Sequence, residues 1–249
     1  MYQNYIFDLY GTLVDIRTNE SKAYLWKKFS LMLNMQGADY TYTELRTRYR
    51  ELVSQEQTLM LEKMQTAYHK DTLTVQDIEI SLENIWKQLL SEHDEDHSQQ
   101  RIRDISVFFR ALSLEYIRLF DDVTDLLGRL HAAGKKIYLL SNAQRIFTEP
   151  EIHMLGIHDY FDGILYSSDA GVKKPETCFF QALFDKFHLQ KKNSVMIGND
   201  RIADIEGAHR FGIDSMYIHT AQSTPFSDEL PGSCRRLQCI GDAYPALRT

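Results

Sequence analysis

Short apolar runs alternate with amphipathic stretches along the second half of this chain. The runs contain mostly β-branched, aromatic and leucine side chains, and they show little alternation of apolar with polar positions. They are residues 136–140, 164–166, 194–197 and 215–218. Strands that are buried on both faces have this composition, because neither face meets water. The runs therefore predict strands of a parallel sheet that is covered on both sides.

The stretches between these runs repeat apolar residues at three- and four-residue steps, which is the spacing of an amphipathic helix. They cover residues 123–133, 146–155, 175–187 and 202–211. Strands that alternate with helices of about ten residues form an α/β fold. We therefore predict a doubly wound parallel sheet, with a first strand at residues 5–7 and an edge strand at residues 236–240.

A long helical stretch separates the first strand from the rest of this pattern. Helical spacing covers residues 20–35, 43–68, 75–90 and 96–109. We expect no strand between these segments, because no alternating pattern occurs there. The prediction is an α/β core domain of residues 1–16 and 120–249, with an inserted all-helical domain of residues 17–119.

The first strand ends in an acidic residue. In the sequence Tyr5-Ile-Phe-Asp8-Leu-Tyr10-Gly-Thr12, a carboxylate follows the strand and precedes a turn. Backbone amides of such a turn can surround an anion, and a carboxylate can attack phosphorus or an activated carbon. The alternative is that Asp8 only stabilises the turn, as Asp often does before Gly.

Polar residues also follow three later strands. They are Ser141 and Asn142, then Lys174 before Pro175, and then Asn199, Asp200 and Asp204. Each group alone is common in turns and at helix N-termini. Open parallel sheets bind ligands at the carboxyl ends of their strands, so the four groups together predict one site.

A phosphate ester would use each of these residue types. Mg²⁺ between a carboxylate and a phosphate removes their repulsion, and oxygen ligands suit this ion. We predict metal ligands from Asp8, from the backbone carbonyl near Tyr10 and from the fourth group. Ser141, the amide of Asn142 and the positive charge of Lys174 would contact the transferring oxygens.

Composition narrows the possible functions. The chain has 249 residues and a formal net charge of -7, which disfavours general binding to nucleic acid. No apolar run approaches the roughly 18 residues that span a bilayer. The three cysteines lack metal-type spacing and indicate reduced thiols in a cytoplasmic protein. We expect a cytoplasmic protein whose partner is a small anionic molecule, and the pattern favours no particular oligomeric state.

In this order the motifs resemble those of the haloacid dehalogenase superfamily of hydrolases. The first motif of that family, Asp-x-x-Gly-Thr, matches Asp8 to Thr12, and the second and third match Ser141 and Lys174. The acidic fourth motif matches residues 199–204. The resemblance implies a Rossmann-like core, an aspartate nucleophile at Asp8, catalysis with Mg²⁺ and a mobile C1-type cap at the position of the helical insertion.

Two features of the motifs point in opposite directions. The family's phosphatases have a second aspartate where this chain has Tyr10, whereas its metal-independent 2-haloacid dehalogenases have tyrosine there. The fourth motif retains the carboxylates of Asp200 and Asp204, which favours a Mg²⁺ site. Because charge dominates Mg²⁺ affinity, we favour Asp200 over the neutral Asn199 as the ligand. We expect Asp204 to orient Lys174 without binding the metal itself.

Three hypotheses follow, and the leading one is a Mg²⁺-dependent phosphatase of a small phosphorylated metabolite. Its catalytic residues would be Asp8, Tyr10 and Lys174, and its phosphate contacts Thr12, Ser141, Asn142 and Lys174. A phenol with a pKa of about 10 is a poor proton shuttle at neutral pH, so we expect slow turnover. The alternatives are a metal-independent 2-haloacid dehalogenase and a binding or regulatory protein with a degenerate site.

Overall fold

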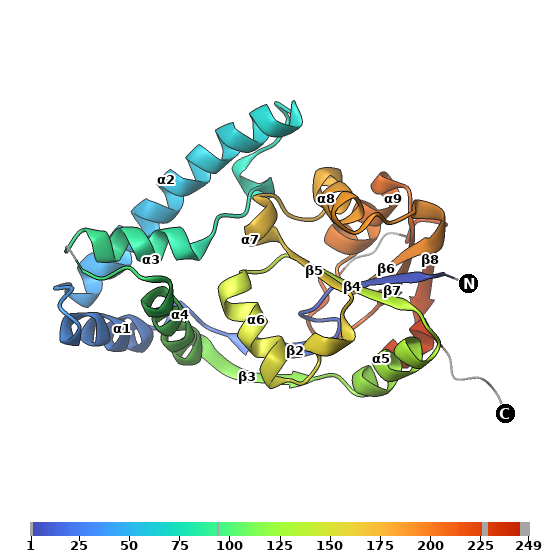
Figure 1. The fold of residues 1–249 in the computed structure, drawn as a ribbon, viewed down its shortest axis with the longest axis horizontal. Coiled ribbons are helices and arrows are strands. Elements are labelled where there is room, and N and C mark those ends of the chain that lie inside the picture. Colours follow the sequence, from blue (N-terminus) through green and yellow to red (C-terminus); the bar gives the residue numbers. More distant parts are fainter. Residues whose placement is uncertain (1, 94, 226–228, 245–249) are drawn as a thin grey trace.

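The sheet predicted from the apolar runs is present. The computed structural model describes residues 2–93, 95–225 and 229–244, so residues 1, 226–228 and 245–249 of the predicted core domain and residue 94 of the predicted helical domain lie outside the described part. The sheet has six strands in the order β5-β4-β1-β6-β7-β8, and every neighbouring pair is parallel (Figure 1). The predicted α/β fold is therefore confirmed.

Strand β1 (Asn4–Phe7) lies inside this sheet, between β4 and β6. The other strands are β4 (Lys136–Ser141), β5 (Gly163–Tyr166), β6 (Ser194–Gly198), β7 (Asp214–Ile218) and β8 (Cys234–Leu237). Phe7 is in register with Leu139 of β4 and with Ile197 of β6. The carboxyl ends of these three strands consequently meet at one edge. β8 is the predicted edge strand, although it begins and ends earlier than residues 236–240.

Successive residues of β1 face opposite sides of the sheet, as the pleat of a strand requires. Tyr5 and Phe7 belong to an apolar cluster with helix α5 and part of α6. Ile6 belongs to a second cluster with α8 and α9. These helices are α5 (Val123–Ala132), α6 (Arg145–Met154), α8 (Thr177–Phe187) and α9 (Gly207–Phe211). Helices cover both faces, so the prediction of a doubly wound sheet is confirmed.

Two strands that the sequence analysis did not predict connect the core to the helical insertion. β2 (Val14–Thr18) and β3 (Leu114–Leu119) form an antiparallel ribbon, in which Val14 pairs with Leu119. The expectation that residues 17–119 contain no strand was therefore wrong. β3 is stabilised by pairing with a segment far away in the sequence, and local periodicity does not report such a contact.

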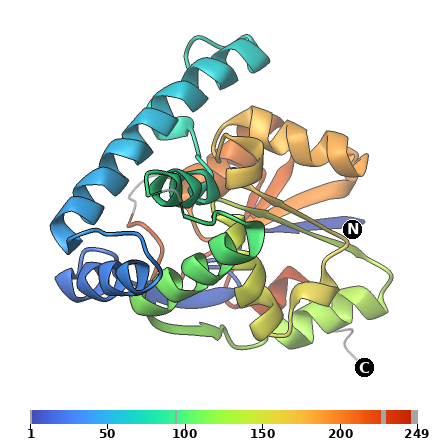
Figure 2. The ribbon, with the colours of Figure 1, turned by 60° about the vertical axis from the view of Figure 1, so that its left-hand side comes forward.

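The segment between these two strands, residues 19–113, is called the cap below. Its helices are α1 (Ala23–Met35), α2 (Tyr42–Tyr68), α3 (Leu82–Ser91) and α4 (Gln99–Ser113), which gather on one side of the sheet (Figure 2). Inside the cap, Trp26, Phe29, Trp86 and Phe109 form ring contacts with centroids 5.1–6.5 Å apart. The predicted domain boundaries stay a prediction. None of the helices in the described part of the chain has the length and apolar character needed to cross a membrane.

The predicted helix at residues 75–90 is interrupted. A 3₁₀ turn, η1 (Val75–Asp77), and helix α3 (Leu82–Ser91) flank an extended stretch. Ile78 in this stretch forms a β-bridge with Val172 of the core. A tertiary contact has therefore overridden the helical pattern of the local sequence.

The cap meets the core at a second place, next to this bridge. The amide of Lys173 donates to the carbonyl of Asp77 at 3.0 Å, and the amide of Glu79 donates to the carbonyl of Gly171 at 3.1 Å. Met64 of α2 lies against Gly171, where an added Cβ would approach the Met64 sulfur to 2.9 Å. The cap is thus attached to the core both through the β2–β3 ribbon and beside Lys173.

Replacing Phe109 with alanine should lower the free energy of unfolding by about 3–5 kcal/mol, because its ring is fully buried among aromatic side chains. Phe108→Ala is the matched control. The neighbouring ring is 37% exposed, and its removal should change stability by less than about 1 kcal/mol. Urea unfolding followed by circular dichroism measures both effects. Equal losses in the two variants would contradict a cap core built around Phe109.

Candidate active site

The chain turns back on itself directly after β1. The amides of Leu13 and Val14 donate to the carbonyl of Leu9 at 2.8 and 2.9 Å. Gly11 has a φ of +85°, and a Cβ at this position would lie 2.4 Å from Nδ2 of Asn199. Glycine permits both this backbone conformation and this approach. The ends of β1 and β6 consequently lie side by side.

Asp8 follows β1 directly, and its carboxylate is fixed by two hydrogen bonds. Lys174 Nζ donates to Oδ1 at 2.7 Å, and Thr12 Oγ1 lies 3.1 Å from Oδ2. The same Nζ donates to Oδ1 of Asp204 at 2.6 Å. Lys174 and Asp204 are almost fully buried, while Asp8 is 8% exposed. One buried ammonium therefore joins two carboxylates at the edge of the sheet.

The pKa values in this cluster reflect burial and charge in competition. Burial alone would lower the pKa of Lys174, but the carboxylates of Asp204 and Asp8 outweigh it and raise that pKa. Burial raises the pKa of Asp204, and the charge of Lys174 opposes the rise. With all three groups ionised the cluster has a net charge of minus one. Additional positive charge is therefore favoured beside Asp8.

Asn199 and Asp200 follow β6 and contact different partners. Oδ1 of Asn199 lies 3.1 Å from Thr12 Oγ1, the hydroxyl that also approaches Asp8. Oδ1 of Asp200 instead accepts two backbone amides at 2.8 and 2.7 Å and caps the π-helix η4 (Arg201–Glu206). One hydroxyl thus joins Asn199 to Asp8. This geometry moves our preference for the metal ligand from Asp200 to Asn199, and the choice stays a prediction.

Asp204 has room beside β6 because the strand ends in glycine. A Cβ at Gly198 would lie 2.1 Å from Oδ2 of Asp204. That oxygen accepts the amide of Asp200 at 3.0 Å, while Oδ1 accepts Lys174 Nζ. Both carboxylate oxygens are therefore used, and Asp204 fixes the position of the Lys174 ammonium.

Ser141 and Asn142 lie at the end of β4, where the sequence predicted phosphate contacts. Ser141 is the last residue of the strand and is 1% exposed. The side chain of Asn142 pairs with the backbone of Lys174: Nδ2 donates to its carbonyl at 3.0 Å, and Oδ1 accepts its amide at 2.8 Å. The Asn142 side chain therefore positions Lys174, which the sequence did not indicate. The predicted contact between the backbone amide of Asn142 and the transferring oxygens stays a prediction.

The phenol of Tyr10 is held by side chains of α6. Its hydroxyl lies 2.9 Å from Thr148 Oγ1 and also donates a hydrogen bond to Glu151. Burial, and then the charge of Glu151, raises the pKa of Tyr10 well above its usual range. A phenol in this setting retains its proton. The geometry therefore favours a positioning role for Tyr10 over the predicted catalytic one.

The sequence analysis missed a buried ion pair next to Tyr10. Arg110 of α4 donates from Nε to Oε1 of Glu151 at 2.6 Å, and its guanidinium lies 5.2 Å from the centre of the Phe147 ring. Arg110 comes four positions after the buried Ser106, and Glu151 comes four positions after the buried Phe147. Each charge thus occupies the buried face of its helix. That pattern is the signal that could have revealed the pair.

A pocket of about 410 Å³ lies between the cap and the core. Tyr10 and Asn142 of the core line it, together with Glu79 and Arg110 of the cap. Burial raises the pKa of Glu79, whose carboxylate accepts a hydrogen bond from Gln144 at 2.8 Å. The pocket borders the predicted site residues, so it can hold the part of a substrate that does not react.

Comparison with known families agrees with this arrangement. The haloacid dehalogenase-like hydrolase family matches residues 2–212, a range that includes every predicted site residue. The chain belongs to the haloacid dehalogenase-like hydrolases. The resemblance drawn from the four motifs is therefore confirmed at the level of the superfamily, and the protein is a hydrolase.

Curated relatives of this haloacid dehalogenase-like hydrolase are named phosphatases. A glyceraldehyde 3-phosphate phosphatase from Methanothermobacter thermautotrophicus is 26% identical over 114 residues, 46% of this chain and 50% of that protein. A phosphoglycolate phosphatase from Escherichia coli is 23% identical over 245 residues, 97% of this chain and 90% of that protein. For several relatives, including the first of these, the chain matches only about half of their length.

A solved structure of the same fold has a different name. The 2-haloacid dehalogenase from Pseudomonas syringae pv. tomato is 16% identical, and the alignment covers 98% of this chain and 96% of that one. Its TM-score is 0.60. At this identity the likeness shows a shared fold and no more.

Replacing Tyr10 with phenylalanine should change kcat by less than about tenfold, which is about 1.4 kcal/mol in the barrier. The phenol retains its proton, so its loss removes a hydrogen bond and no proton donor; stability should fall by about 1 kcal/mol. Glu151→Gln should lower stability more, by about 3 kcal/mol, because it leaves the buried Arg110 without its carboxylate. Steady-state kinetics and urea unfolding separate the effects. A loss of kcat beyond a hundredfold in Tyr10→Phe would assign proton transfer to the phenol.

Proposed function

We propose that this hydrolase is a Mg²⁺-dependent phosphatase of a small phosphorylated metabolite, with Asp8 as its nucleophile. One observation carries the proposal: the Lys174 ammonium and the Thr12 hydroxyl hold the two oxygens of Asp8 at the end of β1. A carboxylate fixed and partnered in this way is suited to attack phosphorus. The phosphatase names of the curated relatives support the same reaction.

The donor atoms around Asp8 suit Mg²⁺. They are the Asp8 carboxylate, Oδ1 of Asn199, which shares the Thr12 hydroxyl with Asp8, and the backbone carbonyl of Tyr10. All are oxygens, which Mg²⁺ prefers, and the negative charge beside Asp8 favours a cation. When bound, the ion would lessen the repulsion between Asp8 and the phosphate.

The chain's own residues would carry the reaction in two steps. In the first, an Asp8 oxygen forms a bond to phosphorus while the bond from phosphorus to the ester oxygen breaks, and the leaving oxygen takes up a proton. In the second, water attacks phosphorus, releases phosphate and restores the Asp8 carboxylate. Thr12, Ser141 and Lys174 would hold the phosphoryl oxygens in both steps. Asp204 would keep the ammonium in place, as the 2.6 Å hydrogen bond suggests.

The proton for the leaving group would come from water or from an acid of the cap. Tyr10 is a poor source because burial and Glu151 raise its pKa. Glu79 lines the same pocket, and burial raises its pKa toward the range of a general acid. We therefore expect slow turnover compared with a phosphatase that has an aspartate two positions after its nucleophile.

The pocket limits the substrate that we propose. Its volume of about 410 Å³ suits a small metabolite with a single phosphate near Asp8. The helical cap, which we take to be of the C1 type, would choose among such metabolites. A formal net charge of -7 disfavours nucleic acid as the substrate, and we place the protein and its small substrate in the cytoplasm as part of the proposal.

Metal-independent dehalogenation of a 2-haloacid is the second candidate. Two features favour it: Tyr10 occupies the position of the second aspartate, and the residue joined to Asp8 through Thr12 is the neutral Asn199. In that reaction an Asp8 oxygen would form a bond to carbon as the carbon–halogen bond breaks. Water would then cleave the ester and release the hydroxy acid.

Asp8→Asn should reduce turnover by more than about 10⁴-fold while the protein stays folded, because an amide is not a nucleophile. Asp185→Asn, at an exposed position of α8, is the matched control and should leave activity unchanged. Phosphate release from a panel of phosphate esters with Mg²⁺ measures activity, and circular dichroism measures folding. Full-speed turnover by the Asp8 variant would rule out the covalent mechanism.

A chelator separates the candidate functions in the same assay. EDTA should abolish phosphate release, whereas halide release from 2-haloacids would persist. Halide release without metal, together with no hydrolysis of any ester, would assign the dehalogenase. Binding of phosphate without turnover, and without an aspartyl intermediate trapped by a phosphate mimic, would assign a binding or regulatory protein.

Asn199→Asp should lower the Mg²⁺ concentration for half-maximal activity by about tenfold, because a carboxylate replaces a neutral oxygen donor. Asp200→Asn is the matched control. Asparagine caps a helix about as well as aspartate, so this variant should keep its stability and its Mg²⁺ requirement. Activity measured against Mg²⁺ concentration tests both. Weaker Mg²⁺ binding in Asp200→Asn alone would return the ligand role to Asp200.

A further inference from the structure

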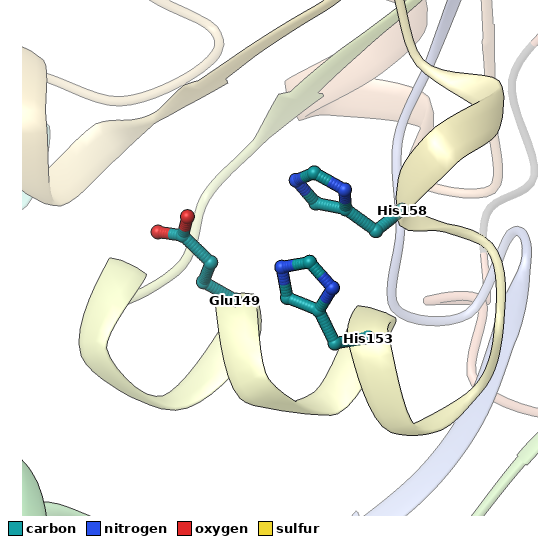
Figure 3. A group of neighbouring side chains, drawn as sticks. All are labelled: Glu149, His153 and His158. Atoms are coloured by element: carbon teal, nitrogen blue, oxygen red, sulfur yellow. The ribbon is translucent and has the colours of Figure 1, made fainter.

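Three potential metal ligands gather outside the candidate active site. Glu149 and His153 lie on α6, and His158 begins the 3₁₀ turn η2 (His158–Tyr160) that follows this helix. One ligand atom from each residue lies within 4.8 Å of the others. Figure 3 shows the Glu149 carboxylate and one nitrogen of each ring facing a common space.

The sequence spacing explains the convergence. Glu149 and His153 are four residues apart on a helix, so they lie one turn apart on the same face. The rings of His153 and His158 stack with centroids 3.8 Å apart and an angle of 20° between their planes. Ligand atoms about 2 Å from a tetrahedral zinc ion lie about 3.3 Å from one another. Closing the three ligands on an ion therefore needs side-chain movements of about 1.5 Å, within the reach of rotations about the side-chain bonds.

A carboxylate already orients one of these rings. Oδ1 of Asp159 lies 2.9 Å from Nδ1 of His158. A proton on Nδ1 directs the lone pair of Nε2 toward the metal, and histidine ligands of metals almost always have such a partner on their other nitrogen. The exposed Asp159 thus supplies the orienting contact that a metal-bound histidine requires.

An unpartnered hydroxyl lies in the same region. A cavity of about 290 Å³ is lined by Glu149 and His158 and also by Tyr166. Tyr166 is 2% exposed, and its hydroxyl has no hydrogen-bond partner within the part of the chain that the structure describes. Buried hydroxyls without partners are rare. Tyr166 therefore borders the same cavity as Glu149 and His158, and its hydroxyl is available to a polar ligand bound there.

The nearby arginine does not compete strongly for the cluster. Arg145 lies 3.6 Å from Oε2 of Glu149. Its guanidinium already donates two hydrogen bonds to Asp169, at 2.7 and 2.5 Å. The Glu149 carboxylate is therefore free to bind a cation through Oε1.

We propose that Glu149, His153 and His158 form a binding site for a divalent transition metal of the zinc class. Two imidazoles and a carboxylate are typical ligands of Zn²⁺, and they leave a fourth position for water. This site shares no residue with the oxygen-rich site at Asp8. It also differs in the metal that it should bind, because imidazole ligands favour Zn²⁺ over Mg²⁺. Asp159 orients the His158 ring, and Tyr166 lines the adjoining cavity.

Isothermal titration of the metal-stripped full-length protein with Zn²⁺ tests the site, with Mg²⁺ in excess to occupy oxygen-rich sites. We expect one Zn²⁺ per chain. His153→Ala and His158→Ala should each weaken binding by at least a hundredfold. Asp159→Asn should weaken it by about 10–100-fold, because it disturbs the orientation of His158 and leaves all three ligands in place.

Two matched variants control for other ligands. His209→Ala removes an exposed histidine elsewhere on the core, and Cys239→Ser removes an exposed thiol. Both should bind Zn²⁺ like the unaltered protein. The proposal is overturned if the unaltered protein does not bind Zn²⁺, if the His153 and His158 variants bind it equally well, or if binding disappears in Cys239→Ser.

Discussion

The buried ammonium of Lys174 is the interaction on which the rest of the site depends. It donates to Asp8 and Asp204 at 2.7 and 2.6 Å, in surroundings where an isolated charge would be strongly destabilised. The arrangement needs the carboxyl ends of β1 and β6 side by side, and it needs glycine at position 198 to admit Asp204. The contacts that hold Lys174 therefore depend on the parallel register of the sheet.

A second buried charge pair links the cap to this site. Arg110 of α4 and Glu151 of α6 pair across the boundary between cap and core, and the Tyr10 hydroxyl bonds to the same carboxylate. Tyr10 comes two residues after Asp8, so the cap is connected to Asp8 through a short chain of contacts. Another connection runs through Asp77 to Lys173, next to Lys174. The cap therefore contacts the core beside two of the predicted site residues.

The sequence was sufficient for features that depend on local pattern or on a motif. Apolar runs predicted the buried strands, and the Asp8 and Lys174 motifs predicted which strand ends carry polar groups. The β2–β3 ribbon and the bridge at Ile78 join distant segments, so no local periodicity predicts them. The direction in which a side chain points could not be predicted from the sequence either. Asp200 has the charge expected of a metal ligand, yet one of its oxygens caps η4.

The ribbon has an evolutionary consequence. Thr18 pairs with Leu114, so the chain leaves the core for the cap and returns to it at one point. A segment inserted at such a point can lengthen, shrink or be exchanged by recombination without shifting the register of any parallel strand. Variation in the inserted segment would therefore alter the pocket between cap and core without moving the sheet that positions Asp8 and Lys174.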